Sequence, residues 1–337
     1  MRLLRFRERT AAPAAARLAA VLETSDGTRP LPLDELELDG AAGEGVARAD
    51  LAELLAADPD LVATRQAVAS RAKTGGTVDR RLTRALAPLR PGKIVGVGLN
   101  YRDHVAEQGI AMPDRPVLFT KFANAVVGDG DPIVRHGHTE ALDFEAELAL
   151  VIGRPTSRVR AADAGAYIAG YMAANDVSAR DLQGVKAALP PGGRGDGQWL
   201  RAKGSDTFCP LGPTLVTRDE LPDPTRLAVR SWRTVADSAG QPRVEAMQDG
   251  RTSDMIFGVE WLVAFVSEVI MLEPGDVILT GTPAGVGVFR EPPVFLRPGD
   301  VATIEVESVG RLSNPVVDAD GRAPDGSPAA RLLAGLA

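Results

Sequence analysis

Short apolar runs separated by turns containing Pro and Gly dominate the sequence after about residue 92. Their β-branched content and short length are typical of buried and half-buried strands. Helical periodicity is confined to a few segments, near residues 161–166 and 253–267. The pattern predicts an α+β, mainly β fold with rolled sheets, rather than a doubly wound parallel sheet. The predicted strands include residues 94–98, 117–119, 148–152, 215–217, 277–280 and 301–306.

Turn signals divide the chain into three parts. The sequence Leu89-Arg90-Pro91-Gly92-Lys93 precedes the first strand of the main pattern. Residues 1–90 are therefore expected to form a small N-terminal β-rich domain, and residues 91–318 are expected to form the main domain. Residues 319–337 are rich in Gly, Pro and Ala and are expected to form a loosely held tail.

Composition excludes several classes of partner. The chain has 337 residues, a formal net charge of -7 and a single cysteine, Cys209. The negative charge argues against nucleic-acid binding, and no apolar stretch reaches the ~20 residues of a membrane-spanning helix. The Arg- and Ala-rich start resembles an edge strand or an organellar transit peptide, and Glu8 favours the strand. We expect a cytoplasmic protein with no nucleic-acid or membrane partner.

Acidic residues recur in the segment 142–152. Side chains alternate between the two faces of a strand, so Asp143, Glu145 and Glu147 should share one face. Asp176 follows the apolar run 167–174 and can reach a central site from the end of a buried strand. Clustered carboxylates repel one another unless a cation neutralises them, and their hard oxygens suit Mg2+, Mn2+ or Ca2+. The alternatives are a solvated acidic face and, for Asp176, an ordinary Asx turn.

One histidine stands beside a carboxylate. His104 and Glu107 are three residues apart and would be neighbours on a helical turn, where the carboxylate could orient the imidazole as a base that activates water. The alternative is a surface pair without function. His136 and His138 lie in a polar loop and are not expected to bind a metal.

Two further segments carry groups that could contact an anion. Lys203 follows a Gly-rich loop and could neutralise a carboxylate or a developing enolate, although a single lysine is most often a surface residue. Gly281 and Thr282 follow an apolar run and offer an amide and a hydroxyl, or else form a plain turn. Gly96 and Gly98 superficially match a dinucleotide motif, but Tyr101 replaces its third glycine, so a nicotinamide cofactor is not indicated.

Across about residues 92–315 the order of these motifs resembles the fumarylacetoacetate hydrolase family. The similar segments are Gly98-Leu99-Asn100-Tyr101 with His104 and Glu107, Asp143-Phe144-Glu145-Ala146-Glu147-Leu148, Asn175-Asp176-Val177-Ser178-Ala179-Arg180-Asp181, Gln198-Trp199 with Lys203, Pro210-Leu211-Gly212-Pro213 and Thr280-Gly281-Thr282-Pro283.

The resemblance implies a rolled β-sheet catalytic domain in a homodimer that binds a small 2-oxo acid. It also implies a site for Mg2+ or Mn2+. The metal ligands would be Glu145, Glu147 and Asp176; the catalytic residues would be His104, Glu107 and Lys203; and the substrate contacts would be Arg180, Gln183, Gly281 and Thr282.

The resemblance leaves several functions open. The first is hydrolysis of a C–C bond in an acylpyruvate-like or 2,4-diketo acid, with His104 and Glu107 directing water at a carbonyl. The second is decarboxylation or tautomerisation of oxaloacetate through a metal-bound enolate. Residues 121–128 and 252–257 resemble a subgroup linked to oxaloacetate, acylpyruvates or diketo-sugar acids. A third is a non-catalytic protein that binds oxo acids. The long stretch 184–197, Ser205 and the missing Asn-Gly hairpin in 233–251 depart from the family pattern and bear on substrate choice.

Overall fold

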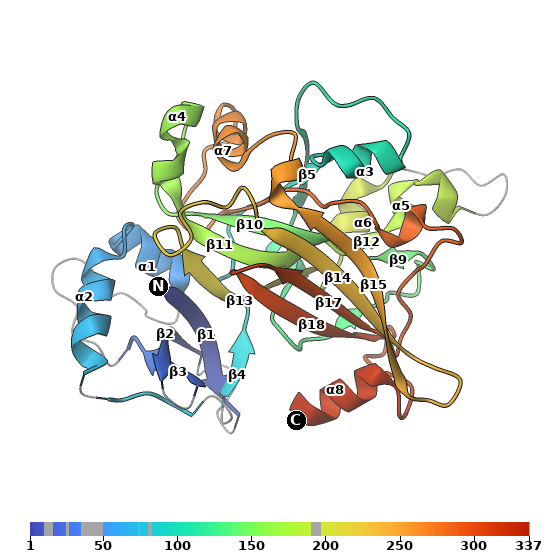
Figure 1. Cartoon of the computed structure of the whole chain (residues 1–337), viewed down its shortest axis with the longest axis horizontal. Helices are drawn as coiled ribbons and strands as arrows, with labels where there is room; N and C mark the ends of the chain where they lie inside the picture. The colour runs from blue at the N-terminus through green and yellow to red at the C-terminus, as the bar shows by residue number, and fades with distance from the viewer. Residues whose placement is uncertain are drawn as a thin grey trace.

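Two large sheets dominate the computed structural model (Figure 1), which describes residues 1–9, 16–24, 27–34, 50–73, 75–79, 83–189 and 197–336. The strands of the larger sheet are β1 (Arg2–Glu8), β2 (Arg17–Thr24), β3 (Gly27–Pro32), β4 (Thr83–Leu86), β5 (Ile94–Gly98), β6 (Val117–Lys121), β7 (Val126–Val127), β10 (Ala146–Ile152), β11 (Ile168–Asn175), β13 (Cys209–Thr217) and β16 (Val277–Leu279). They follow the order β3-β2-β1-β13-β11-β10-β16-β5-β6, with β4 paired to β1 and β7 paired to β13.

The smaller sheet has five strands in the described residues, in the order β15-β14-β17-β18-β8. These strands are β8 (Ile133–Val134), β14 (Ala228–Ala236), β15 (Pro242–Arg251), β17 (Val301–Val306) and β18 (Gly310–Val317), and a separate pair joins β9 (Leu142–Asp143) to β12 (Ser178–Ala179). The helices are α1 (Leu51–Ala57), α2 (Val62–Arg71), α3 (Arg102–Glu107), α4 (Ala161–Ala164), α5 (Arg180–Gln183), α6 (Trp199–Gly204), α7 (Val259–Ser267) and α8 (Pro328–Leu336). The predicted α+β, mainly β fold is confirmed.

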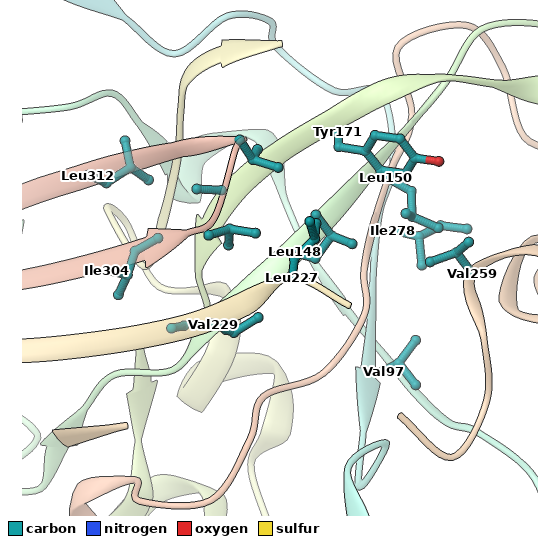
Figure 2. Close-up of a cluster of buried hydrophobic side chains, with 14 of the residues drawn as sticks. Val97, Leu148, Leu150, Tyr171, Leu227, Val229, Val259, Ile278, Ile304 and Leu312 are labelled. Atoms are coloured by element: carbon teal, nitrogen blue, oxygen red, sulfur yellow. The ribbon is translucent and has the colours of Figure 1, made fainter. Parts of the chain in front are cut away.

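The core lies between the two sheets. Every residue of β10 and β11 is buried, which explains why both strands are almost continuously apolar in sequence. Figure 2 shows Leu148 and Leu150 of the larger sheet in the same cluster as Val229, Ile304 and Leu312 of the smaller one. Burial of such side chains is the main source of stability, at about 25 cal/mol for each Å² of apolar surface. The acidic residues at the start of β10 are thus held by a rigid, well-packed strand.

The N-terminal strands continue the larger sheet. Arg2 and Leu3 of β1 pair with Val216 and Leu215 of β13. A second apolar cluster includes N-terminal side chains such as Leu51 together with Met172 of β11. The expected boundary near residue 90 therefore falls within one continuous sheet and a shared core. A separate N-terminal domain stays a prediction.

The C-terminal segment carries the helix α8. Ala329 is fully buried, and its amide donates to the carbonyl oxygen of Gly299 at 3.0 Å. Residues 328–336 therefore form a helix anchored to the domain, where the Gly- and Pro-rich composition predicted a loosely held tail. The apolar periodicity of this short stretch, rather than the turn residues before it, decides its structure.

Candidate active site

Three carboxylates converge at one end of the central strands. Glu145 immediately precedes β10, Glu147 lies within it, and Asp176 immediately follows β11. Antiparallel pairing of Ala146 with Asn175 brings these strand ends together, and the amide of Asp176 donates to the carbonyl oxygen of Glu145 at 3.0 Å. One oxygen from each carboxylate lies within 4.8 Å of the others, and all three residues are buried. The predicted acidic triad is therefore assembled, and it does not face solvent.

Asp143 does not join this triad. The strand is interrupted at residues 144–145, because β9 pairs with β12 and β10 pairs with β11 and β16. The Asp143 carboxylate instead accepts hydrogen bonds from the amides of Gly287 and Val288, at 2.9 and 3.1 Å, and from Nε of Arg180 at 2.9 Å. Asp143 therefore lies outside the triad and positions Arg180, which also binds Glu145.

Two cations neutralise part of the triad. Nζ of Lys203 donates to Glu145 at 2.9 Å and to Asp176 at 2.6 Å. Nη2 of Arg180 donates to the other oxygen of Glu145 at 2.5 Å, and its Nη1 donates to Gln183 at 3.0 Å. Lys203 is thus a buried site residue rather than a surface lysine, and Arg180 and Gln183 are connected as a pair.

A third cation was not predicted from the sequence. Nζ of Lys121 lies 2.6 Å from Oδ1 of Asp176 and donates to the carbonyl oxygens of Val177, Lys203 and Phe208 at 3.0, 2.6 and 2.7 Å. Lys121 is buried, so its charge is fixed beneath the triad and does not reach the cavity. Its place on the edge strand β6 suggests a surface lysine, and nothing local in the sequence indicates otherwise.

The charges around each carboxylate set its pKa. Burial alone would raise the pKa of Glu145, but Arg180 and Lys203 outweigh it and hold that pKa well below the usual range. Burial, together with the nearby charges of Asp176 and Glu145, raises the pKa of Glu147 well above its usual value. Glu147 accepts a hydrogen bond from the amide of Gly281 at 2.8 Å, and no ion pair of Glu147 is found among the described residues.

This donor set fits a hard divalent cation. Three buried carboxylates offer oxygen ligands at short mutual distances, as Mg2+, Mn2+ and Ca2+ require. Glu147 is the carboxylate with the least neutralisation, because Lys203 and Arg180 are directed at its neighbours. A cation bound beside Glu147 would relieve the repulsion that raises its pKa. The triad can therefore hold a metal ion.

A cavity of about 240 Å³ opens onto the triad. Charged, polar and apolar side chains all line this cavity. Glu107, Asp176 and Gly281 are not in the wall and support it from behind. The predicted site residues that line the cavity are His104, Glu145, Glu147, Arg180, Gln183, Lys203 and Thr282, and the apolar part of the wall includes Val97, Leu99, Phe119, Val185, Trp199 and Phe289.

The predicted dyad forms on α3. Nδ1 of His104 lies 2.6 Å from Oε1 of Glu107, and the other oxygen of Glu107 accepts from the amide of Gly285 at 2.9 Å. Nε2 of His104 faces the cavity side, 3.0 Å from Nε2 of Gln108. In the tautomer in which Glu107 accepts from Nδ1–H, Nε2 is the acceptor nitrogen of the ring. Gln108, which the sequence did not single out, then donates to that nitrogen.

Asn100 fixes the start of this helix against the rest of the site. Its side chain donates to the carbonyl oxygens of Thr280 and Phe257 at 2.7 and 3.1 Å and accepts from the amide of Phe257 at 2.9 Å. Leu99 before it has a positive φ of 57°, a conformation that a leucine adopts only when its surroundings hold it there. The dyad is therefore tied to the end of β16.

The Gly-Thr loop after β16 is held by hydrogen bonds rather than free to bind an anion by itself. Oγ1 of Thr282 donates to the carbonyl oxygen of Ala146 at 2.9 Å and accepts from Nε2 of Gln248 at 2.7 Å. Gly281 has φ of 92°, and a Cβ there would lie 2.9 Å from Cβ of Asn100. Gln248, buried on β15, was not predicted because its contacts with Thr282 and Ala146 join segments far apart in the chain.

The other two histidines lie elsewhere. The rings of His136 and His138 stack at 5.5 Å between centroids, and neither lines the cavity. Residues 190–196 of the stretch 184–197, which bears on substrate choice, lie outside the described residues. None of the helices in the described ranges combines the length and the apolar character needed to span a membrane.

Comparison with known proteins identifies the family of this chain. The family profile described as "Fumarylacetoacetate (FAA) hydrolase C-terminal" matches residues 93–317. The protein named oxaloacetate tautomerase FAHD2A, mitochondrial, of Homo sapiens is 46% identical over 233 residues, which is 69% of each chain. The protein named oxaloacetate tautomerase Fahd2a, mitochondrial, of Rattus norvegicus is 40% identical over 293 residues, covering 83% of this chain and 86% of its own.

Solved structures share the whole architecture. The structure titled 2-hydroxyhepta-2,4-diene-1,7-dioate isomerase from Mycobacterium marinum is 35% identical, with a TM-score of 0.67, and covers 95% of this chain and 99% of its own. The structure of a fumarylacetoacetate hydrolase from Exiguobacterium antarcticum is 32% identical, with a TM-score of 0.69, and covers 94% and 99%. Because the profile spans the segment that carries the triad, the dyad and the cavity, this chain is an enzyme of the fumarylacetoacetate hydrolase family.

Proposed function

We propose that this enzyme interconverts the keto and enol forms of oxaloacetate. The observation that carries the proposal is that two carboxylates of the buried triad, together with Arg180 and Lys203, line one cavity of about 240 Å³, a volume that suits a small dicarboxylic acid. The names of the curated relatives support tautomerisation over the C–C bond hydrolysis first expected from the sequence.

The residues supply what a proton shift next to a carbonyl needs. The C3 protons of oxaloacetate lie between two carbonyl groups, so a positioned base can remove one while the C2 oxygen gains a proton. Lys203 and Arg180 are cations whose donors can bind a substrate carboxylate or an oxygen that becomes negative. In the tautomer that donates from Nδ1 to Glu107, Nε2 of His104 can accept the C3 proton once it is released from Gln108.

A divalent metal is proposed as the cofactor. Glu145, Glu147 and Asp176 would hold Mg2+ or Mn2+, with Ca2+ as a further candidate on the chemistry of the oxygen ligands. When bound, such an ion polarises a 2-oxo group as a Lewis acid.

Hydrolysis of an acylpyruvate-like or 2,4-diketo acid is the second candidate. The observation that favours it is the His104–Glu107 dyad, because a carboxylate-oriented imidazole is the arrangement that activates water. Decarboxylation of oxaloacetate needs the same carboxylate contacts and differs only in the bond that breaks.

One assay separates these functions. The purified full chain, with Mg2+ or Mn2+, is given oxaloacetate in its enol form and an acylpyruvate, and products are followed by NMR against a reaction without enzyme. Faster enol loss with all four carbons retained supports the tautomerase. Release of pyruvate and CO2 indicates the decarboxylase, and cleavage of the acylpyruvate indicates the hydrolase. Tight oxalate binding without turnover of any substrate would leave the non-catalytic alternative.

The assembly and the location are also proposals. We expect the homodimer implied by the family resemblance and a cytoplasmic location, whereas the names of the curated relatives place those proteins in mitochondria. Light scattering of the purified chain tests the dimer, and fractionation of cells that express the tagged full chain tests the location.

A further inference from the structure

A second cavity of about 670 Å³ lies away from the active site, against β1 and β4. We call it the basic cleft. It is lined on one side by arginines of the N-terminal strands and on the other by the turn after β6. The residues that define it are Arg5, Arg7, Arg84, Arg90, Asn124 and Asp131.

The strand register places these arginines together. Arg5 and Arg7 are two positions apart on β1 and share one face of the sheet. Arg7 stands directly opposite Arg84 in the antiparallel β1·β4 pair. Like charges at directly opposed positions destabilise a sheet unless something neutralises them.

Neutralisation inside the basic cleft is incomplete. Four arginines face one aspartate, in a chain whose formal net charge is -7. Asp131 forms an ion pair with Arg84. Burial, and then the charge of Arg90, lowers the pKa of Arg5, while Asp50 acts in the opposite direction. No ion pair of Arg7 or Arg90 is found among the described residues, so the cleft keeps positive charge on these two side chains.

Two donors inside it lack acceptors. Nε of Arg7 and Nε of Arg84 are buried and have no hydrogen-bond partner among the described residues. Buried N–H groups are ordinarily satisfied, so two such donors beside one another point to a missing acceptor. A solvated arginine face would leave its Nε atoms accessible to water, which is not the case here.

We propose that the basic cleft binds a small anion carrying two or more phosphate or carboxylate groups. Guanidinium groups bind such oxygens in bidentate pairs, so an anion seated between Arg7 and Arg84 would accept from their terminal nitrogens and, once the side chains turn toward it, from the Nε atoms that now lack a partner. The volume of the cleft accommodates an anion of this size. This site is separate from the proposed active site and does not depend on its function.

The far wall of the basic cleft is tied to the active site. Nδ2 of Asn124 donates to the carbonyl oxygen of Gly204 at 3.1 Å and to Asp206 at 2.6 Å, directly after Lys203. Lys121 stands three residues before Asn124 at the end of β6. An anion seated against this turn therefore contacts the segment that positions the two buried lysines.

Calorimetric titration of the metal-free full chain at low salt tests the proposal, with pyrophosphate and citrate as probes. We expect saturable binding of at least one probe. Tighter binding of pyrophosphate would identify a phosphate-bearing ligand, and tighter binding of citrate would identify a carboxylate-bearing ligand. Arg7→Gln combined with Arg84→Gln should weaken that binding at least about tenfold. Arg154→Gln with Arg218→Gln, two arginines of another surface pocket, is the matched control and should leave the affinity within about twofold.

Arg180→Gln distinguishes the basic cleft from the active site, because it removes an active-site cation and should leave probe binding unchanged. If Arg7→Gln with Arg84→Gln unfolds the chain, Arg7→Lys with Arg84→Lys keeps the charge but not the bidentate geometry, and it should still weaken binding more than the control. Absence of saturable binding of both probes, or equal loss in the control pair, would overturn the proposal. The proposal would also be overturned if Arg180→Gln lost probe binding while Arg7→Gln with Arg84→Gln kept it.

Discussion

Lys121 and Asp176 are buried against each other, with Nζ 2.6 Å from Oδ1, and Lys121 makes no contact with the cavity. Its ammonium is held by three backbone carbonyls, so it cannot move toward a substrate. It acts as a fixed countercharge beneath one metal-ligand candidate. The first prediction tests this relationship.

Lys121→Met should cost about 3 kcal/mol of unfolding free energy, because it leaves a buried carboxylate without its partner and three carbonyls without a donor. Urea unfolding of the metal-free chain measures the change. Lys186→Met, at an exposed position, is the control and should change the unfolding free energy by less than about 0.5 kcal/mol. Equal stability of the two variants would show that Lys121 is not a structural countercharge.

Glu145→Gln should lower turnover of the true substrate at least about 100-fold. Loss of a residue that merely supports a metal ligand lowers metal affinity or activity about 10- to 100-fold. Loss of a ligand itself should lower activity by at least the larger of these factors. Glu140→Gln, an exposed carboxylate, should keep full activity. Removal of divalent ions with a chelator should abolish activity, and added Mg2+ or Mn2+ should restore it. Undiminished turnover in the chelated enzyme would contradict the metal site.

His104→Asn should reduce the rate by about 10²- to 10⁴-fold if this imidazole is the base. Glu107→Gln keeps the ring but removes the carboxylate that orients it, and it should give a smaller loss. Both variants are compared in enol loss and in acylpyruvate cleavage. A large effect on cleavage alone would assign the dyad to water activation and leave another residue to move the proton in tautomerisation.

Asp143→Asn should raise KM more than it lowers kcat. Asp143 holds Nε of Arg180, and a freed guanidinium would bind a substrate carboxylate less precisely. Loss of one hydrogen bond to a charged group corresponds to roughly tenfold in kcat/KM. Steady-state kinetics measures the separate changes in kcat and KM, and circular dichroism checks that the variant folds. A pure fall in kcat would argue that Arg180 contributes to the chemical step itself.

Cys209 should resist alkylation in the folded chain. Burial raises the pKa of this thiol to about 12, so very little thiolate exists at mildly alkaline pH. As pH rises above the usual pKa of about 9, the unfolded chain loses the thiol proton first and is stabilised relative to the folded one. The unfolding free energy of the native chain should therefore fall relative to that of Cys209→Ala between about pH 9 and 11. Alkylation at equal rates in native and unfolded protein would refute the buried thiol.

Local patterns were enough to predict much of the site. The apolar run after Glu147 predicted the buried strand β10, and the strand end before Asp176 predicted the convergence that the pairing of Ala146 with Asn175 produces. His104 and Glu107 lie on one turn of a helix, so their contact also follows from spacing alone. These relationships depend on residues close in sequence or on strands that pair as neighbours.

Relationships between distant segments could not be predicted. Asp143 binds Arg180 and the amide of Gly287 instead of joining the triad, because β9 pairs with β12, a register that no local pattern specifies. Gln248 contacts Thr282 from a different sheet, and Lys121 reaches Asp176 across the core. The N-terminal strands joined the larger sheet through β13, more than 200 residues away in the chain. Each of these depends on tertiary packing, which propensity and periodicity do not encode.

The loop that follows β16 bears on how substrate specificity can change among enzymes with this site. Its amides bind Glu147, Glu107 and Asp143 in turn, so one short backbone segment holds a metal-ligand candidate, the dyad and the partner of Arg180. The apolar side chains that line the cavity, such as Leu99 and Trp199, are not bound by these amides. Mutations can therefore reshape the space that selects a substrate while the reactive groups keep their positions, so new specificities are accessible without rebuilding the chemistry.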